Sequence, residues 1–294
     1  MNNQKTGIIY ATTGTRERGA VQSYHDRTLI STLAPLFLNK TKHAIDIAGL
    51  KKSVQRSAIK IDGADYEAKF TIGFEVEKNQ LSRNAVKEYE LFCKFERDGS
   101  CGYEAVTHVL PLLPSGKWRT KVFDLMHKAE KIIDDRFSPS DRRCGGHITI
   151  ACDGLTGDEL RTAIRKNCGI VLALFRNRLK NTYCNGNNRL ENNTNHSRYQ
   201  VTLSKGNCLE FRLPSRFESV KQMMRRYELM YELVNYSVSK PNGSHDGFLK
   251  VITPIIVSMY NGDTDKANEV IKLSKHFRAY ILKGDIHQDI LQYL

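Results

Sequence analysis

The sequence lacks several features that would place the protein in a special class. It has no run of about 18 apolar residues, the length that a membrane-spanning helix needs. Its first residues show no basic segment followed by an apolar one, so we expect no secretory signal. None of its seven cysteines forms a C-x-x-C pair, which argues against a structural zinc site or a thioredoxin-like motif. Scattered cysteines instead fit small buried hydrophobes in a reducing compartment, so we expect a soluble, cytoplasmic protein without membrane partners.

The composition is that of an ordinary globular protein. Hydrophobic residues make up 40% of the 294 residues and charged residues 26%, which argues against a disordered chain and allows a sizeable core. The hydrophobic pattern divides the chain into three predicted parts. They are a basic N-terminal region at residues 1–65, a core at residues 66–216, and a helical region at residues 217–294 that packs on the core.

Positive charge is concentrated near the N-terminus. The net charge is +13, and residues 1–60 carry ten Lys and Arg against three Asp and Glu. Such a surface could attract nucleic acid or a polyanionic substrate, and it could equally be a solvated face that keeps the protein soluble. No named nucleic-acid-binding motif accompanies the charge, so nucleic acid is an alternative partner and not our first expectation.

Alternation of apolar and polar residues predicts several strands. In residues 66–78 the alternation has period two, which is typical of a strand with one face in the core. Other expected strands are residues 89–96, 102–110 and 147–152, and a hairpin of residues 199–204 and 208–213 around Lys205-Gly206-Asn207.

Helical spacing of apolar residues dominates the remainder. A capping box at Thr156-x-x-Glu159 predicts the start of a long helix, and a second at Ser215-x-x-Glu218 predicts the start of the C-terminal helical region. Apolar stripes in residues 220–281 are typical of core-facing helices. Strands grouped in hairpins and followed by helices predict an α+β fold, built on an antiparallel sheet flanked by helices.

The polar face of the predicted strands carries residues suited to metal and phosphate chemistry. Glu75 and Glu77 lie roughly 7 Å apart on one strand and point the same way. Such paired carboxylates can bind Mg²⁺ or Mn²⁺, although solvated sheet faces carry the same pattern. His147 follows two glycines, which indicates a backbone that bends or approaches a ligand closely. Glu210 and Arg212 project together from one strand, where an exposed ion pair is the simpler interpretation.

The order of these motifs resembles that of the amidoligase family, carboxylate–amine ligases that share the glutamine synthetase fold. The matching segments are Gly73-Phe74-Glu75-Val76-Glu77, Asp98-Gly99-Ser100, Gly102-Tyr103-Glu104-Ala105-Val106-Thr107, Cys144-Gly145-Gly146-His147, Arg176-Asn177-Arg178, Asn181-Thr182-Tyr183-Cys184, Arg198-Tyr199 and Leu209-Glu210-Phe211-Arg212. These segments fall within residues 70–216 and leave both ends of the chain unexplained.

The resemblance implies an enzyme that uses ATP to phosphorylate a carboxylate, after which an amine displaces the phosphate to form an amide. It also implies two or more Mg²⁺ or Mn²⁺ ions that bridge ATP phosphates and the acyl oxygen. The implied metal ligands are Glu75, Glu77, Glu104, His147 and Glu210.

Other residues take roles from the same resemblance. Arg178, Arg198 and Arg212 would bind the γ-phosphate or the substrate carboxylate, because a guanidinium fork matches both. The implied nucleotide contacts are Thr149, Arg176, Tyr183 and Asn185. Residues 181–197, rich in Asn, would form a lid that keeps water from the acyl phosphate.

Two departures from the family pattern leave alternatives open. Thr149 stands where many family members carry a second histidine, and Glu104 is the one acid that matches the middle segment. The chain could therefore be a ligase with altered substrates, whether small molecules, peptides or proteins, or a descendant that has lost catalysis. The other hypotheses are a non-catalytic nucleic-acid-binding protein on the same scaffold and a metal-dependent nuclease or hydrolase.

Overall fold

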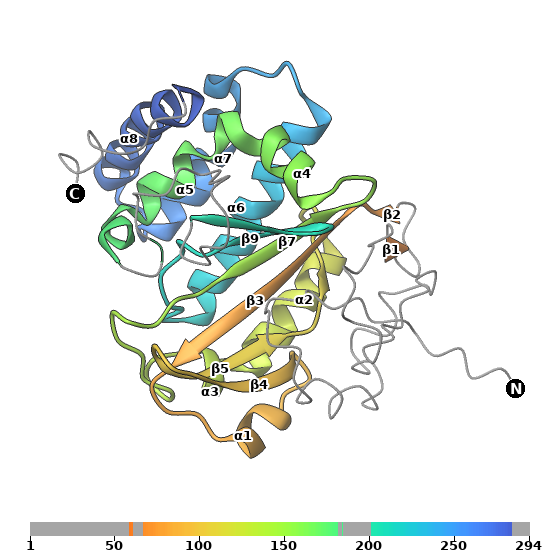
Figure 1. Cartoon of the computed structure of the whole chain (residues 1–294), viewed down its shortest axis with the longest axis vertical. Helices are drawn as coiled ribbons and strands as arrows, with labels where there is room; N and C mark the ends of the chain where they lie inside the picture. The colour runs from red at the N-terminus through yellow and green to blue at the C-terminus, as the bar shows by residue number, and fades with distance from the viewer. Residues whose placement is uncertain (1–58, 61–66, 182–183, 185–200, 284–294) are drawn as a thin grey trace, which may run out of the picture.

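The computed structural model describes residues 59–60, 67–181, 184 and 201–283. The strands are β1 (Ile59–Lys60), β2 (Glu67–Ala68), β3 (Phe70–Lys78), β4 (Phe92–Asp98), β5 (Gly102–Thr107), β6 (Leu110–Pro111), β7 (Ile148–Cys152), β8 (Thr202–Lys205) and β9 (Cys208–Phe211). The α-helices are α1 (Arg83–Lys87), α2 (Lys117–Lys128), α3 (Glu130–Ile133), α4 (Gly157–Ile164), α5 (Gly169–Leu174), α6 (Val220–Ser239), α7 (His245–Met259) and α8 (Thr264–Lys283). Two 3-10 turns are η3 (Arg165–Asn167) and η4 (Arg176–Lys180). The predicted α+β class is confirmed (Figure 1).

The main sheet has seven strands in the order β4-β5-β3-β7-β9-β8, with β6 paired to β3. All of these neighbours run antiparallel, as the sequence predicted. β3 lies in the middle, where its first half pairs with β7 and its second half pairs with β5. All nine residues of β3 are buried, including those on its polar face. The sequence predicted one buried face, and the structure shows that this strand has two.

One face of the sheet packs against α6, and α2 packs against α6; both helices run behind the sheet in Figure 1. Phe74 of β3 contacts Phe217 edge-on, with ring centroids 5.6 Å apart. Phe123 of α2 contacts Tyr227 of α6 in the same way at 5.3 Å. These buried aromatic rings remove a large apolar area from water, and edge-to-face pairs are favourable beyond that burial. The helices therefore fix the sheet from its apolar side.

Tyr227 also ties α6 to the edge of the sheet through polar bonds. Its hydroxyl donates to the carbonyl oxygen of Pro111 at 2.6 Å and accepts from the amide of Leu113 at 2.7 Å. Both backbone groups lie in the core, where an unpaired amide or carbonyl would be costly. The Tyr227 hydroxyl thus provides a hydrogen-bond partner for both of these backbone groups at the end of β6.

The start of the C-terminal helical region differs from the prediction at Ser215. The helix α6 begins at Val220, and its N-cap is Ser219, whose hydroxyl accepts from the amide of Gln222 at 3.3 Å. Ser215 instead pairs with Gly145 across an isolated bridge and accepts a bond from the buried Arg226. The predicted capping box at Ser215 and Glu218 was therefore wrong, because tertiary contacts hold Ser215 in a bridge with Gly145.

The long helix predicted after Thr156 is interrupted. The Thr156–Glu159 capping box is present, but α4 ends at Ile164 and α5 begins only at Gly169. A Cβ atom on Gly169 would lie 2.2 Å from the carbonyl oxygen of Ser274, so α5 and α8 approach each other closely here. The break lets α5 turn onto α8, a contact that local helix periodicity does not encode.

All seven cysteines are buried and free of disulfides, as expected for small hydrophobic side chains. Within the described residues, no helix is long and apolar enough to cross a membrane.

Candidate metal centre

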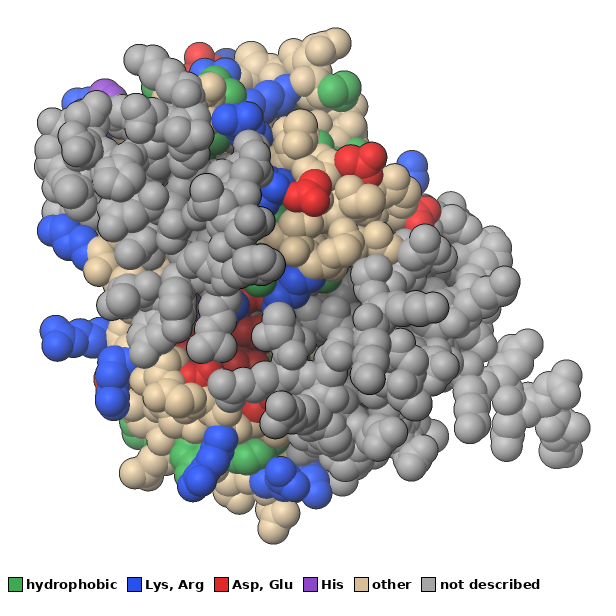
Figure 2. Space-filling model, in the orientation of Figure 1, with side chains coloured by type: hydrophobic (Ala, Val, Ile, Leu, Met, Phe, Trp, Pro, Cys, Tyr) green, Lys and Arg blue, Asp and Glu red, His purple; other side chains and the backbone are tan. Residues whose placement is uncertain are grey.

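Alternation and register bring the predicted acids to the polar face of the sheet. Glu75 and Glu77 share this face of β3, and Glu104 of β5 is the register partner of Glu77. On the other side of β3, Thr149 of β7 is the partner of Glu210 of β9. All five of these residues are buried. In Figure 2, acidic side chains gather near the middle of the view, beside lysine and arginine side chains.

Glu75, His147 and Glu210 converge most closely. Each offers one ligand atom, and these atoms lie within 4.8 Å of one another, which suits a metal ion. His147 Nδ1 lies 2.6 Å from Glu75 Oε2 and 4.0 Å from Glu210 Oε1. The other ring nitrogen, Nε2, lies 3.5 Å from Glu77 Oε1. The imidazole therefore stands between three carboxylates.

Gly145 makes this arrangement possible. Its amide donates to Glu77 Oε2, and a Cβ atom at this position would lie 2.9 Å from His147 Nε2 and 3.0 Å from Glu77 Oε1. Gly146 is constrained as well, since its Cβ would lie 2.4 Å from the carbonyl oxygen of Ser215. The two glycines thus allow the backbone to pass directly beside the acids.

Charge is unevenly distributed over the site. Burial raises the pKa of Glu75, but the close contact and hydrogen bond with His147, together with the charges of Lys205 and Arg212, outweigh that effect and hold it at about 2. Burial raises the pKa of Glu104 well above its usual value, and the neighbouring Glu75 and Glu77 raise it further. On the β5 side the carboxylates therefore outweigh the nearby Lys94, whereas the β9 side is supplied with the cations Lys205 and Arg212.

Lys205 belongs to this cation-rich side, and sequence reasoning missed it. Its ammonium is ion-paired to Glu210 Oε2, and Arg212 Nη1 is ion-paired to Glu210 Oε1. Burial lowers the pKa of Lys205 to about 8, against the attraction of Glu75. The sequence placed Lys205 in the hairpin turn. Lys205 is the last residue of β8 and the register partner of Cys208, which lies two residues before Glu210 on β9. Strand alternation could therefore have placed Lys205 on the polar face.

Three buried oxygen atoms at the centre have no hydrogen-bond partner among the described residues. They are Glu75 Oε1, Thr149 Oγ1 and Glu210 Oε2, on side chains that are 3%, 0% and 0% exposed, and the last of them is contacted by the Lys205 ammonium. Buried oxygens normally have partners, because desolvation without a bond costs about 1–3 kcal/mol. Oxygen ligands are also what Mg²⁺ and Mn²⁺ prefer. The donor set therefore fits a hard divalent cation.

The predicted arginines differ in placement. Arg178 is buried, and its Nη1 donates to the carbonyl oxygen of Cys144 at 2.9 Å, while Nη2 would lie 3.2 Å from a Cβ on Gly145. Arg176 instead pairs with Glu269 of α8 at 3.0 Å, so the structure does not bring it to the acids. Outside the described residues lie Tyr183, Asn185, Arg198 and all of the predicted lid except Asn181 and Cys184.

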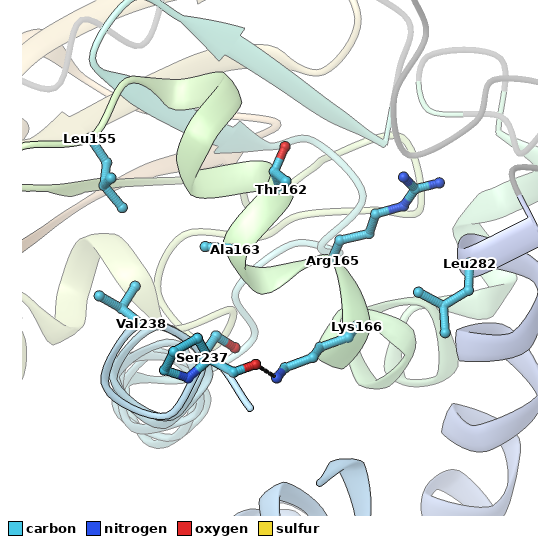
Figure 3. A pocket seen from close by; sticks show the side chains of 9 residues that line it. Leu155, Thr162, Ala163, Arg165, Lys166, Ser237, Val238 and Leu282 are labelled. Atoms are coloured by element: carbon cyan, nitrogen blue, oxygen red, sulfur yellow. Dashed lines mark hydrogen bonds between the residues drawn. The ribbon is translucent and has the colours of Figure 1, made fainter. Parts of the chain in front are cut away.

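A cavity of about 430 Å³ lies elsewhere, between α4, η3 and the C-terminal ends of α6 and α8 (Figure 3). Leu155, Val238 and Leu282 give it apolar walls. Lys166 lines it and donates to the carbonyl oxygen of Pro241 (Figure 3) and also to that of Gly243. None of the predicted site residues lines this cavity, so it is separate from the acids.

Comparison with known proteins adds little to this geometry. No family model and no curated protein matches the chain. Among solved structures, one that matches is titled "Apo GmaS without ligand". The two share 9% identity, with 77% of this chain and 76% of that chain covered, at a TM-score of 0.33. A similarity this low carries no argument about activity, so function has to be argued from the site itself.

Proposed function

We propose that this chain is an ATP- and Mg²⁺-dependent carboxylate–amine ligase that forms an amide through an acyl phosphate. One observation carries the proposal: Glu75 of β3, Glu210 of β9 and His147, directly before β7, place their ligand atoms within 4.8 Å of one another. The order of motifs that resembles the amidoligase family supports the same choice of chemistry. Glu77 and Glu104 add two further carboxylates on the same buried face.

Each residue has a role that follows from its position. When bound, Mg²⁺ neutralises the charge that develops on the phosphoryl group during transfer. The five residues that would hold it are Glu75, Glu77, Glu104, His147 and Glu210. Arg212 and Arg178 stand beside them as cations that bind the transferred phosphate or the substrate carboxylate. The Thr149 hydroxyl, which has no hydrogen-bond partner among the described residues, would contact the nucleotide.

Burial of the site serves this chemistry. An acyl phosphate hydrolyses in water, so a ligase must keep water away while the amine attacks. The side chains of Glu75, Glu77 and Glu210 are at most 4% exposed. Electrostatic interactions are also stronger in such a site than in bulk water, because the local dielectric is lower.

Calorimetric titration tests the proposal directly. The full chain, stripped of metal, is titrated with a non-hydrolysable ATP analogue with and without Mg²⁺. We expect Mg²⁺-dependent binding that Glu75→Gln weakens, because a carboxylate on the buried site is lost. Glu88→Gln, which removes an exposed acid of the same type, is the matched control and should bind like wild type. Absence of metal-dependent nucleotide binding in the wild-type chain would refute the proposal.

Product analysis separates a ligase from its alternatives. With ATP, Mg²⁺ and mixed carboxylates and amines, a ligase forms ADP, phosphate and an amide in equal amounts. ADP without amide indicates an uncoupled ATPase or a hydrolase.

The nucleic-acid-binding hypothesis rests on the basic residues 1–65, which lie almost entirely outside the described residues. It remains a separate prediction, which binding of DNA or RNA at low salt would test.

A further inference from the structure

A series of buried hydrogen bonds ends at the wall of the cavity between α4, η3, α6 and α8. His245 Nδ1 lies 3.1 Å from Asn167 Oδ1, and Asn167 Nδ2 donates to the Ser237 hydroxyl oxygen at 2.9 Å. Burial lowers the pKa of His245 to about 4, so at neutral pH the uncharged ring donates its N–H to Asn167. All three side chains are buried, and Ser237 lines the cavity.

Ser237 is the acceptor in this series, which leaves its own proton to be donated elsewhere. A hydroxyl carries one proton beside its two acceptor positions. Among the described residues no atom accepts the Ser237 proton, although the residue is only 2% exposed. A buried donor without an acceptor is destabilising. Because Ser237 lines the cavity, this donor can serve an acceptor atom that is bound there.

A positive charge lines the same cavity. The Lys166 ammonium donates to the carbonyl oxygens of Pro241 and Gly243, which are uncharged groups (Figure 3 draws the bond to Pro241). No carboxylate pairs with Lys166 in the part of the chain that the structure describes. An ammonium has three N–H groups, so one is left for a ligand. The described lining contains one more cation, Arg165, and no acid, so the cavity favours an anion.

The remaining walls are largely apolar. Leu155, Val238 and Leu282 line the cavity, and the Leu282 side chain is 47% exposed. Leu155 and Leu282 lie on opposite sides of the view in Figure 3, with Ser237 and Lys166 between them. The volume of about 430 Å³ is within the range of small-molecule sites, roughly 300–1,000 Å³. Such walls, with one ammonium and one hydroxyl, fit a ligand that has an apolar body and a small anionic head.

We propose that this cavity binds a free medium-chain fatty acid, whose carboxylate contacts Lys166 and Ser237 and whose hydrocarbon chain lies against the apolar walls. A carboxylate has two oxygens and one charge, which match one hydroxyl and one ammonium. A phosphate monoester carries more charge and a third oxygen, for which these two residues offer no further donor. None of the acids of the metal centre lines the cavity, so the proposal is independent of the ligase activity.

Calorimetric titration measures the affinity. The full chain is freed of bound lipid on a hydrophobic resin and titrated at neutral pH, with EDTA present, with hexanoate, octanoate and decanoate below their micelle concentrations. We expect one molecule per chain and an affinity that rises about fourfold for each added methylene, because burial of each CH₂ is favourable. Octanol has the same chain length without the charge and should bind at least about tenfold more weakly than octanoate.

Variants of the polar residues test the head group. Lys166→Met keeps the length of the side chain without its charge, and it should abolish the preference for octanoate over octanol. Lys166→Arg retains the charge and should retain the preference. Because the preference compares two ligands on one variant, a general loss of folded protein does not change it. Ser237→Ala removes the hydroxyl donor and should weaken octanoate binding about tenfold.

A variant of the wall tests the location. Ala163 lines the cavity on α4, so Ala163→Leu extends a side chain into it and should abolish octanoate binding while keeping a good helix former. Ala279→Leu is the matched control, because Ala279 is exposed on α8 and is not among the lining residues.

The outcomes are decisive for the cavity alone. Absence of octanoate binding to the folded wild-type chain overturns the proposal, and so does octanol binding as tight as that of octanoate. An unchanged preference in Lys166→Met, or unchanged octanoate affinity in Ala163→Leu, assigns the ligand to another place and overturns it as well. Tighter binding of octyl phosphate than of octanoate overturns the choice of a carboxylate. Since EDTA is present throughout, each result leaves the metal-dependent ligase to its own test.

Discussion

Glu77 and Glu104 occupy directly opposed positions on β3 and β5, and both side chains are buried on the same face of the sheet. Opposed like charges destabilise a pair of strands. The metal-free chain bears this destabilisation, and a divalent cation bound at the two carboxylates would reverse it. Stability of the metal-free chain and affinity for metal are therefore expected to change in opposite directions when either acid is removed.

Glu104→Gln should stabilise the metal-free chain at alkaline pH. Burial and the neighbouring Glu75 and Glu77 raise the pKa of Glu104. The folded chain thus binds a proton that the unfolded chain releases above about pH 4.5, so wild-type stability falls as the pH rises toward the folded pKa. Urea unfolding at pH 5 and pH 8 with a chelator measures this. Excess Mn²⁺ should reverse the order of the two proteins, and a wild type more stable than Glu104→Gln at pH 8 without metal contradicts the prediction.

Gly145→Ala should damage the metal site more than the fold. The new methyl group would contact His147 Nε2 and Glu77 Oε1 at about the distances of a hydrogen bond, so both must shift. We expect a loss of stability of about 1–3 kcal/mol and a clear loss of Mn²⁺ affinity. Gly99→Ala is the control, because a Cβ at Gly99 meets nothing within 4 Å. Equal Mn²⁺ affinity in both variants would show that Gly145 has no special role.

Tyr227→Phe should destabilise the chain without affecting metal binding. The hydroxyl serves Pro111 and Leu113, and its loss leaves a buried amide and a buried carbonyl without this partner. The expected cost is about 1–3 kcal/mol in the free energy of unfolding, measured by urea denaturation. Mn²⁺ stoichiometry should be unchanged. A variant as stable as wild type would mean that water replaces the hydroxyl.

His245 should make stability depend on pH in the acidic range. Its Nδ1 donates to Asn167 at 3.1 Å, and burial, aided by Arg278, lowers its pKa from 6.5 to about 4. The folded chain favours the neutral ring, so this contribution is complete above pH 6.5 and is lost as the pH falls toward 4. The loss should reach at most about 3 kcal/mol. In His245→Gln, unfolding measured from pH 7 to pH 4 should show a flatter profile, and an unchanged profile would assign the dependence to other groups.

Local patterns were sufficient for much of the fold. Period-two alternation predicted β3 with Glu75 and Glu77 on one face, and the Thr156–Glu159 capping box is present at the start of α4. These features depend on neighbours within a few residues, which the sequence displays directly. The strand pairing of Glu77 with Glu104 and of Thr149 with Glu210 depends on register between distant segments, and it could only be suggested by the order of motifs.

The failures have the same origin. The sequence predicted that Ser215 caps a helix, but in the structure it accepts a hydrogen bond from Arg226 and forms a bridge with Gly145. Gly169 looked like part of a continuous helix, although the close approach of Ser274 fixes it at the start of α5. Lys205 looked like a turn residue, and its role depends on Glu210 across the hairpin. In each case a tertiary contact outweighed a local preference.

The complete burial of β3 has an evolutionary consequence. An ordinary edge or half-exposed strand drifts in sequence on its solvent side, but β3 has no such side, because even its polar residues are enclosed. A substitution there enlarges or empties the apolar core, or it alters the charge around His147. In a library of random single variants, Phe70–Lys78 should therefore tolerate few changes, as should the equally buried strands β7 and β9.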